Sequence, residues 1–151
     1  MTGVCLVGAE DGDLRRDLLA YESARAALST YELSAPYENA LAVETISLGM
    51  AVSLLNDLDW YLARVARDAF VREPSVDESE WLSRDAARAI RDGDVDPDET
   101  ATTLKVYGVV DGRLVEPMYV TRPEGAGVPA YDLRDAEDTV VVRLVPGESG
   151  A

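Results

Sequence analysis

Tryptophan and arginine recur together in the middle of the chain, and their side chains are suited to binding a partner. Trp60 falls on a helix predicted over residues 48–72, on the side opposite its apolar stripe. Trp81 falls on the next predicted helix, again away from the apolar residues. Trp and Arg dominate the hot spots of protein interfaces, and their side chains can stack. The predicted partner-binding surface consists of Asn56, Trp60, Arg64, Arg67, Trp81, Arg84 and Arg88.

Internal packing is the alternative explanation for this surface. Tryptophan is rarely left fully exposed, so the two helices could cover each other's tryptophans, or the β-rich tail could cover both. The two explanations differ in what Trp60→Ala should do: weaken an association, or only lower the melting temperature.

The start of the long helix is a candidate anion site. Ser47 and Gly49 directly follow a predicted strand, where free backbone N–H groups and the helix dipole can bind a phosphate or carboxylate. Simple N-capping by Ser47 is the competing interpretation, and we favour it.

Two further features have ordinary explanations. The acidic run at residues 92–99 resembles a calcium loop, but Pro97 and Thr103 stand where such a loop needs glycine and glutamate. We therefore interpret the run as a solvated linker. Lys105 is the only lysine, and a buried lysine can form a Schiff base. On an alternating strand we expect it to point to water instead.

Most familiar catalytic chemistry is excluded. The chain has no histidine, so neither a Ser-His-Asp nor a Cys-His arrangement nor a histidine metal site can form. It also lacks the GxGxxG, P-loop and CxxC motifs. We predict no catalytic residues, no metal site and no cofactor.

The charge composition indicates adaptation to high salt. The net charge is -15 at pH 7, with 29 acidic and 14 basic residues. In molar salt the Debye length is roughly 3 Å, so carboxylate repulsion is screened while hydration remains. A GC-rich genome could also produce an arginine-rich acidic protein, but the charge density favours a halophile. We see no signal peptide and no apolar run of about 20 residues, and so expect a cytoplasmic protein without a membrane partner.

The elements that position these side chains follow from apolar periodicity. Strands are predicted at residues 4–7, 30–34, 41–47, 104–110, 113–121 and 139–145, and helices at 14–28, 48–72 and 76–93. Ser75 would cap the third helix, and Asp111-Gly112 is a hairpin signal. The order β-α-β-β-α-α-β-β-β predicts an α+β fold. It could be a ferredoxin-like split βαβ core with a C-terminal antiparallel β extension. We expect one domain over residues 1–151, which could form two lobes, 1–93 and 94–151.

Three stretches carry a resemblance to known sequences. They are residues 41–62, residues 80–84 and residues 132–143, the last being Asp132-Leu-Arg-Asp-Ala-Glu-Asp-Thr-Val-Val-Val-Arg. These stretches resemble a family of small uncharacterised haloarchaeal proteins. The resemblance covers most of the chain and implies a haloarchaeal cytoplasm, but it implies no activity and no functional residues.

Four classes of function stay open. The first, which we favour, is a non-catalytic interaction module or accessory subunit, with a protein partner or a homo-oligomer at the Trp60 and Trp81 surface. The second is a small-molecule-binding regulatory domain, by analogy with ferredoxin-like sheets. The third is a carboxylate- or metal-dependent enzyme. The fourth is a nucleic-acid-associated protein, which the charge of -15 opposes.

Overall fold

The computed structural model describes residues 1–148, which form a seven-stranded sheet with helices packed against it. The strands are β1 (Thr2–Val7), β2 (Ala40–Thr45), β3 (Asp68–Arg72), β4 (Trp81–Ser83), β5 (Thr103–Val110), β6 (Arg113–Thr121) and β7 (Asp138–Arg143). The helices are α1 (Leu14–Leu19), α2 (Glu22–Leu28), α3 (Leu48–Val65) and α4 (Arg84–Arg91), with a short 3-10 helix η1 (Pro97–Thr100). The α+β class is confirmed, and the elements follow the predicted order in outline.

The strands lie in the order β2-β1-β3-β4-β7-β5-β6, and within residues 1–148 only the short β4–β7 pairing is parallel. β2 begins beside the end of β1, with Ala40 opposite Val7, so these two strands are antiparallel neighbours. β3 also pairs antiparallel with β1, so β2 and β3 are parallel to each other with β1 between them. Connected by α3, they form the split βαβ unit that the sequence predicted for the first half. The β-rich tail does form an antiparallel extension, in which β5 pairs with both β6 and β7.

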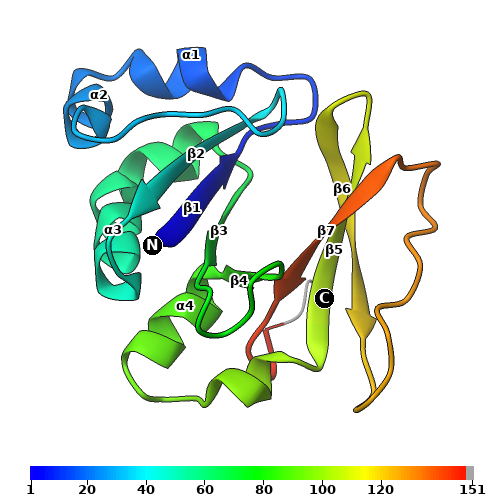
Figure 1. Ribbon diagram of the computed structural model, residues 1–151. Helices are drawn as coiled ribbons and strands as arrows, with labels where there is room; N and C mark the ends of the chain where they lie inside the picture. Colours follow the sequence, from blue (N-terminus) through cyan, green and yellow to red (C-terminus); the bar gives the residue numbers. More distant parts are fainter. Residues whose placement is uncertain (149–151) are drawn as a thin grey trace.

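The two apolar faces of the sheet are covered differently. One face packs against α1 to α4, in a core that includes Leu6 of β1 and Leu58 of α3. On the other face, Cys5 and Phe70 from the first half share a core with Tyr107 of β5. Two strands separate β3 from β5 in the sheet order, so the sheet must curl to bring these side chains together. In Figure 1 the strands β5 to β7 lie to the right of the half formed by β1 to β3 and the helices.

The long helix is shorter than predicted, because most of its last seven predicted residues belong to a strand. α3 ends at Val65, and Ala66 is already extended. The backbone N–H of Arg67 donates to the carbonyl of Val7 at 2.7 Å, which leads the chain into pairing with β1. Phe70 lies in β3 between buried neighbours, as expected of a central strand covered on both faces.

The third helix begins later than predicted, and this moves Trp81 off the helix. Ser83, not Ser75, caps α4, because its hydroxyl accepts the N–H of Ala86 at 3.0 Å. Trp81 lies instead at the start of β4, which pairs with β3. The strand predicted at residues 30–34 is reduced to one bridge, Ser34 with Ala42.

The hairpin between β5 and β6 forms as predicted. Asp111 and Gly112 have φ values of 52° and 77°, the left-handed conformation that a tight hairpin turn requires. The buried Asn39 joins this hairpin to the first half: its amide donates to the carbonyl of Leu114 at 2.8 Å and accepts the N–H of Leu114 at 2.9 Å. Among the described residues, no helix is both long and apolar enough to cross a membrane.

Candidate functional site

An aromatic cluster at the surface consists of Tyr21, directly before α2, and Trp60 and Tyr61 of α3; Trp60 is exposed and the two tyrosines are half-buried. Trp60 is 52% exposed, and its ring centroid lies 5.7 Å from that of Tyr21 and 5.1 Å from that of Tyr61. The guanidinium carbon of Arg64 lies 3.4 Å above the Trp60 ring, and Arg64 also donates to the Trp60 carbonyl at 2.7 Å. We call Tyr21, Trp60, Tyr61 and Arg64 the Trp60 face.

The charge of this face contrasts with the rest of the chain. Acidic side chains outnumber basic ones by 29 to 14, yet among residues 1–148 Arg64 has no carboxylate oxygen within 4.0 Å. The Trp60 ring therefore occupies one side of a guanidinium whose N–H groups can still bind an acceptor. An exposed indole with a stacked guanidinium is suited to binding an apolar spot flanked by carboxylates.

The predicted residues of α4 lie beside this ridge but are engaged within the chain. Asn56, Arg84 and Arg88 line a shallow depression between α3 and α4. Arg84 forms an ion pair with Asp59 at 2.9 Å and donates to a backbone carbonyl of α3. Arg88 pairs with Asp85, one turn earlier on its own helix, at 2.9 Å. Both guanidinium groups thus have carboxylate partners already.

Arg67 and Trp81 lie away from the Trp60 face. Arg67 is exposed beyond the end of α3, with its guanidinium carbon 5.8 Å from the ring of Tyr107. Trp81 is half-buried on the other face of the sheet, with its ring 5.1 Å from that of Phe70. The prediction that both tryptophans share one arginine-bearing surface is therefore wrong. Its cause was the assignment of Trp81 to a helix.

Ser47 performs the capping role that we favoured. Its side chain accepts the N–H of Met50 at 3.1 Å at the start of α3. A side-chain carbon at Gly49 would lie 3.9 Å from the Ser47 hydroxyl. This geometry explains the cap and gives no further indication of an anion site.

Sequence reasoning missed a cleft on the concave side of the sheet, between β1–β2 and β7. Its volume is about 520 Å³, and Arg72 and Trp81 are among its lining residues. The guanidinium carbon of Arg72 lies 4.7 Å from the Trp81 ring centroid. A nitrogen of Arg72 lies 3.8 Å from an oxygen of Glu44, too far for a hydrogen bond. No local sequence pattern predicts this cleft, because its lining residues come from segments distant in sequence.

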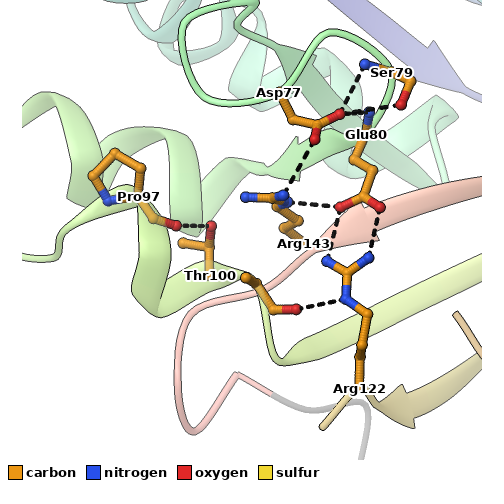
Figure 2. A network of polar contacts seen from close by, with 8 residues as sticks. Asp77, Ser79, Glu80, Pro97, Thr100, Arg122 and Arg143 are labelled. Atoms are coloured by element: carbon orange, nitrogen blue, oxygen red, sulfur yellow. Dashed lines mark hydrogen bonds and ion pairs between the residues drawn. The ribbon is translucent and has the colours of Figure 1, made fainter. Parts of the chain in front are cut away.

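Glu80, which also lines this cleft, is the centre of a network of ion pairs (Figure 2). Glu80 accepts two hydrogen bonds from Arg122, at 2.7 and 2.9 Å, and one from Arg143 at 2.7 Å. Arg143 also reaches Asp77 at 3.3 Å. Hydrogen bonds from Arg122 hold the pKa of Glu80 below its usual range; burial opposes this effect, and Arg143 adds to it. These contacts fix the loop before β4 to the ends of β6 and β7.

Lys105 does not point freely to water, contrary to our expectation. Its ammonium lies 2.6 Å from a carboxylate oxygen of Asp68, and its side chain is 13% exposed. The hydroxyl of Tyr107 donates to the same oxygen at 2.6 Å. Burial first, and then the charge of Asp68, raise the pKa of Tyr107, so this hydroxyl keeps its proton. The curl of the sheet brings Asp68 of β3 to these two side chains of β5, and the arrangement links the two halves.

The acidic run forms the entry to η1. The N–H of Asp96 donates to the carboxylate of Glu99 at 2.8 Å, which caps this short helix. Within residues 1–148, no group of three or more His, Cys, Asp and Glu side chains is placed to hold a metal ion.

Comparisons with known proteins identify a family. The model of a family of unknown function, DUF5804, matches residues 2–109. The match includes Trp60, Arg64 and Arg72 but not Arg122 or Arg143. Neither the curated proteins nor the solved structures contain a match to the chain.

Proposed function

This chain belongs to DUF5804, a family of unknown function, and we propose that it is a non-catalytic protein-interaction module that contacts its partner through the Trp60 face. The observation that carries this proposal is the half-exposed ring of Trp60 beneath Arg64. Tyr21 and Tyr61 pack against this ring and restrict its rotamers before a partner binds. Such preorganisation lowers the entropic cost of binding.

The chemistry of the face specifies the partner. Arg64 has no carboxylate neighbour within the described part of the chain, whereas Arg84 and Arg88 on the neighbouring helix each have one. A carboxylate supplied by the partner would complete the contacts of Arg64 while apolar atoms cover Trp60. We therefore propose a protein partner that presents an apolar patch next to aspartate or glutamate.

The setting of this interaction is also part of the proposal. The net charge of -15 and the single lysine fit a cytoplasm of high salt, such as that of a haloarchaeon. At high salt, long-range charge attraction is screened, so an interface must depend on short-range contacts. Burial of an aromatic ring and a bidentate arginine contact both keep their strength under these conditions better than a distant charge pair does.

The test is an affinity capture in molar KCl from a lysate of the source organism. The tagged full chain is compared with Trp60→Ala, Arg64→Ala and the control Arg16→Ala. Arg16 is a suitable control because it is an exposed arginine of α1 with its own carboxylate partner, Asp17. The proposal expects one protein in stoichiometric amount, lost with both substitutions of the Trp60 face and retained with the control.

The captured protein is then purified, and its affinity for each variant is measured by calorimetry. Removal of a hot-spot tryptophan should lower affinity by about 2 kcal/mol or more, roughly thirtyfold. A partner that binds Trp60→Ala as tightly as the parent chain would refute the Trp60 face. If the chain instead forms a homodimer that Trp60→Ala dissociates, the Trp60 face is the interaction surface and the partner is a second copy of the chain.

A further inference from the structure

We propose that the cleft between β1–β2 and β7 binds a small zwitterion of the α-amino acid type, with its carboxylate on Arg72 and its ammonium on Glu44. This site is separate from the Trp60 face, because it opens on the concave side of the sheet. We call it the Arg72 cleft.

The guanidinium of Arg72 is held in place but still has hydrogen-bond donors available for a ligand. Its guanidinium lies 4.7 Å from the Trp81 ring centroid, which fixes one of its sides. Within residues 1–148 its nearest carboxylate is that of Glu44, at 3.8 Å, and its guanidinium makes no hydrogen bond. A guanidinium binds a carboxylate best through two parallel N–H donors, and Glu44 does not offer that geometry. A ligand carboxylate can.

Gly3 provides the floor on which such a ligand would rest. In the sheet register Gly3 lies opposite Glu44 on one side and Arg72 on the other. A side-chain carbon placed on Gly3 would lie 3.5 Å from a carboxylate oxygen of Glu44 and 3.8 Å from Cβ of Arg72. The missing side chain therefore leaves space between the two opposite charges. The two charged groups of an α-amino acid are attached to one carbon, and this spacing suits a site in which the receiving charges are adjacent.

Charges of both signs line the cleft, and this favours a zwitterion over a simple ion. Glu80 also lines the cleft, but it is neutralised by Arg122 and Arg143. The charges left to face a ligand are those of Arg72, Glu44 and Glu78. A simple anion would meet two carboxylates, and a simple cation would meet the guanidinium. A molecule with one charge of each sign satisfies both requirements.

The walls of the cleft suit an apolar side chain. Tyr37, Trp81 and Val140 contribute to its lining, and its volume of about 520 Å³ lies in the range of small-molecule sites. Burial, followed by the charge of Asp138, raises the pKa of Tyr37. Its hydroxyl therefore stays a neutral donor at physiological pH. We expect leucine and phenylalanine to bind better than glycine, since each adds apolar area to be buried.

The test measures binding of L-leucine and L-phenylalanine to the full chain by calorimetry and by the shift of the melting temperature. The amide and the N-acetyl form of each amino acid remove one charge at a time. Two charged contacts predict that each blocked form binds at least tenfold more weakly. Equal binding of the amides would overturn the role of Arg72, and dissociation constants all weaker than about 1 mM would overturn the site.

Variants separate specific binding from a loss of structure. Arg72→Gln and Glu44→Gln should each lower the affinity for the free amino acids at least tenfold. The N-acetyl form keeps its carboxylate, so Arg72→Gln should weaken its remaining binding as well. This dependence would support the assignment of the carboxylate to Arg72. Gly3→Val fills the floor and should abolish binding. Arg16→Gln is the control, and a loss of binding with this variant would refute the site. Each unliganded variant must unfold in one cooperative transition, and Trp60→Ala must bind the amino acids normally, which keeps this outcome independent of the proposed function.

Discussion

Arg122 and Glu80 form a two-pronged ion pair, with N–O distances of 2.7 and 2.9 Å, although they lie 42 residues apart in sequence. Only 14% and 15% of the two side chains is exposed. Arg143 joins the same carboxylate from the end of β7. One carboxylate thus holds together the loop before β4 and the ends of two other strands, and this relationship has direct consequences for stability.

Glu80→Gln should lower the free energy of unfolding by about 3 kcal/mol, because it leaves the largely buried guanidinium of Arg122 without a counter-charge and leaves Arg143 only the weaker contact with Asp77 at 3.3 Å. Glu78→Gln is the matched control: it makes the same change in charge two residues away, on an exposed side chain. The control should change stability by less than about 0.5 kcal/mol. Urea unfolding followed by circular dichroism measures both values. Equal effects of the two substitutions would show that the network does not stabilise the fold.

The same carboxylate should make stability depend on pH. The pKa of Glu80 is lowered in the folded state from its ordinary value of 4.5, so its contribution is present above that value and is lost as the pH falls through the folded pKa. Asp77 acts in the same direction: burial opposes the change, but N–H groups of Glu80 and Ser79 lower its pKa. Urea titrations from about pH 6 to about pH 3 should show unfolding free energy decreasing below pH 4.5, with a shallower slope for Glu80→Gln. Parallel slopes would assign the acid sensitivity to other carboxylates.

Local signals in the sequence predicted those parts of the fold that depend on neighbouring residues. Ser47 begins α3 because its hydroxyl accepts an N–H three residues ahead. Asp111-Gly112 forms the turn of its hairpin because both residues adopt positive φ. The apolar run at residues 4–7 becomes a buried central strand. In each case the stabilising contact lies within a few residues or follows from apolar content alone.

Errors arose where a distant contact decided the structure. Val65 and Ala69 continue the apolar stripe of α3, so the pattern extended the helix through a segment that pairs with β1 instead. Trp81 lies within residues 76–93, where the spacing of the apolar residues fits a helix, but the pairing of Leu82 and Ser83 with β3 makes this part of the segment a strand. The partners of Glu80 lie 42 and 63 residues away, and no local spacing indicates them. The Arg72 cleft depends on the same distant pairings and could not be predicted.

The two tryptophans should report different environments, which gives a direct check on the exposure of the Trp60 face. Trp60→Phe leaves Trp81 as the only indole, and Trp81→Phe leaves Trp60. The emission of Trp60 should lie at longer wavelength and be quenched more readily by acrylamide, since this residue is 52% exposed whereas Trp81 is half-buried. Trp60→Ala should cost about 1 kcal/mol, mainly the contact with Arg64, whereas Trp81→Ala removes packing on Phe70 and should cost about 3 kcal/mol. Similar quenching of both indoles would place Trp60 in a covered position and remove the basis of the Trp60 face.

Salt should stabilise this protein through screening of its own carboxylates. With a net charge of -15, repulsion opposes the folded state in dilute buffer, and the Debye length falls from about 10 Å at 0.1 M salt to about 3 Å at 1 M. Exposed ion pairs such as Arg88 with Asp85 weaken over the same range, but each contributes at most about 1 kcal/mol. We therefore expect the urea midpoint to rise with KCl over this interval.

Neutralisation of exposed carboxylates distinguishes screening from a general effect of salt on apolar surface. The replaced side chains are exposed and make no ion pair within the described residues: Glu22, Glu32, Asp57, Glu78 and Glu124. Conversion of all five to amides removes five negative charges and should make the KCl dependence shallower, with higher stability at low salt. If repulsion is the cause, the parent and variant curves must converge in molar KCl, where the charges are screened in both. An unchanged slope would mean that salt acts on the burial of apolar surface, and the acidic composition would then need another explanation than adaptation to high salt.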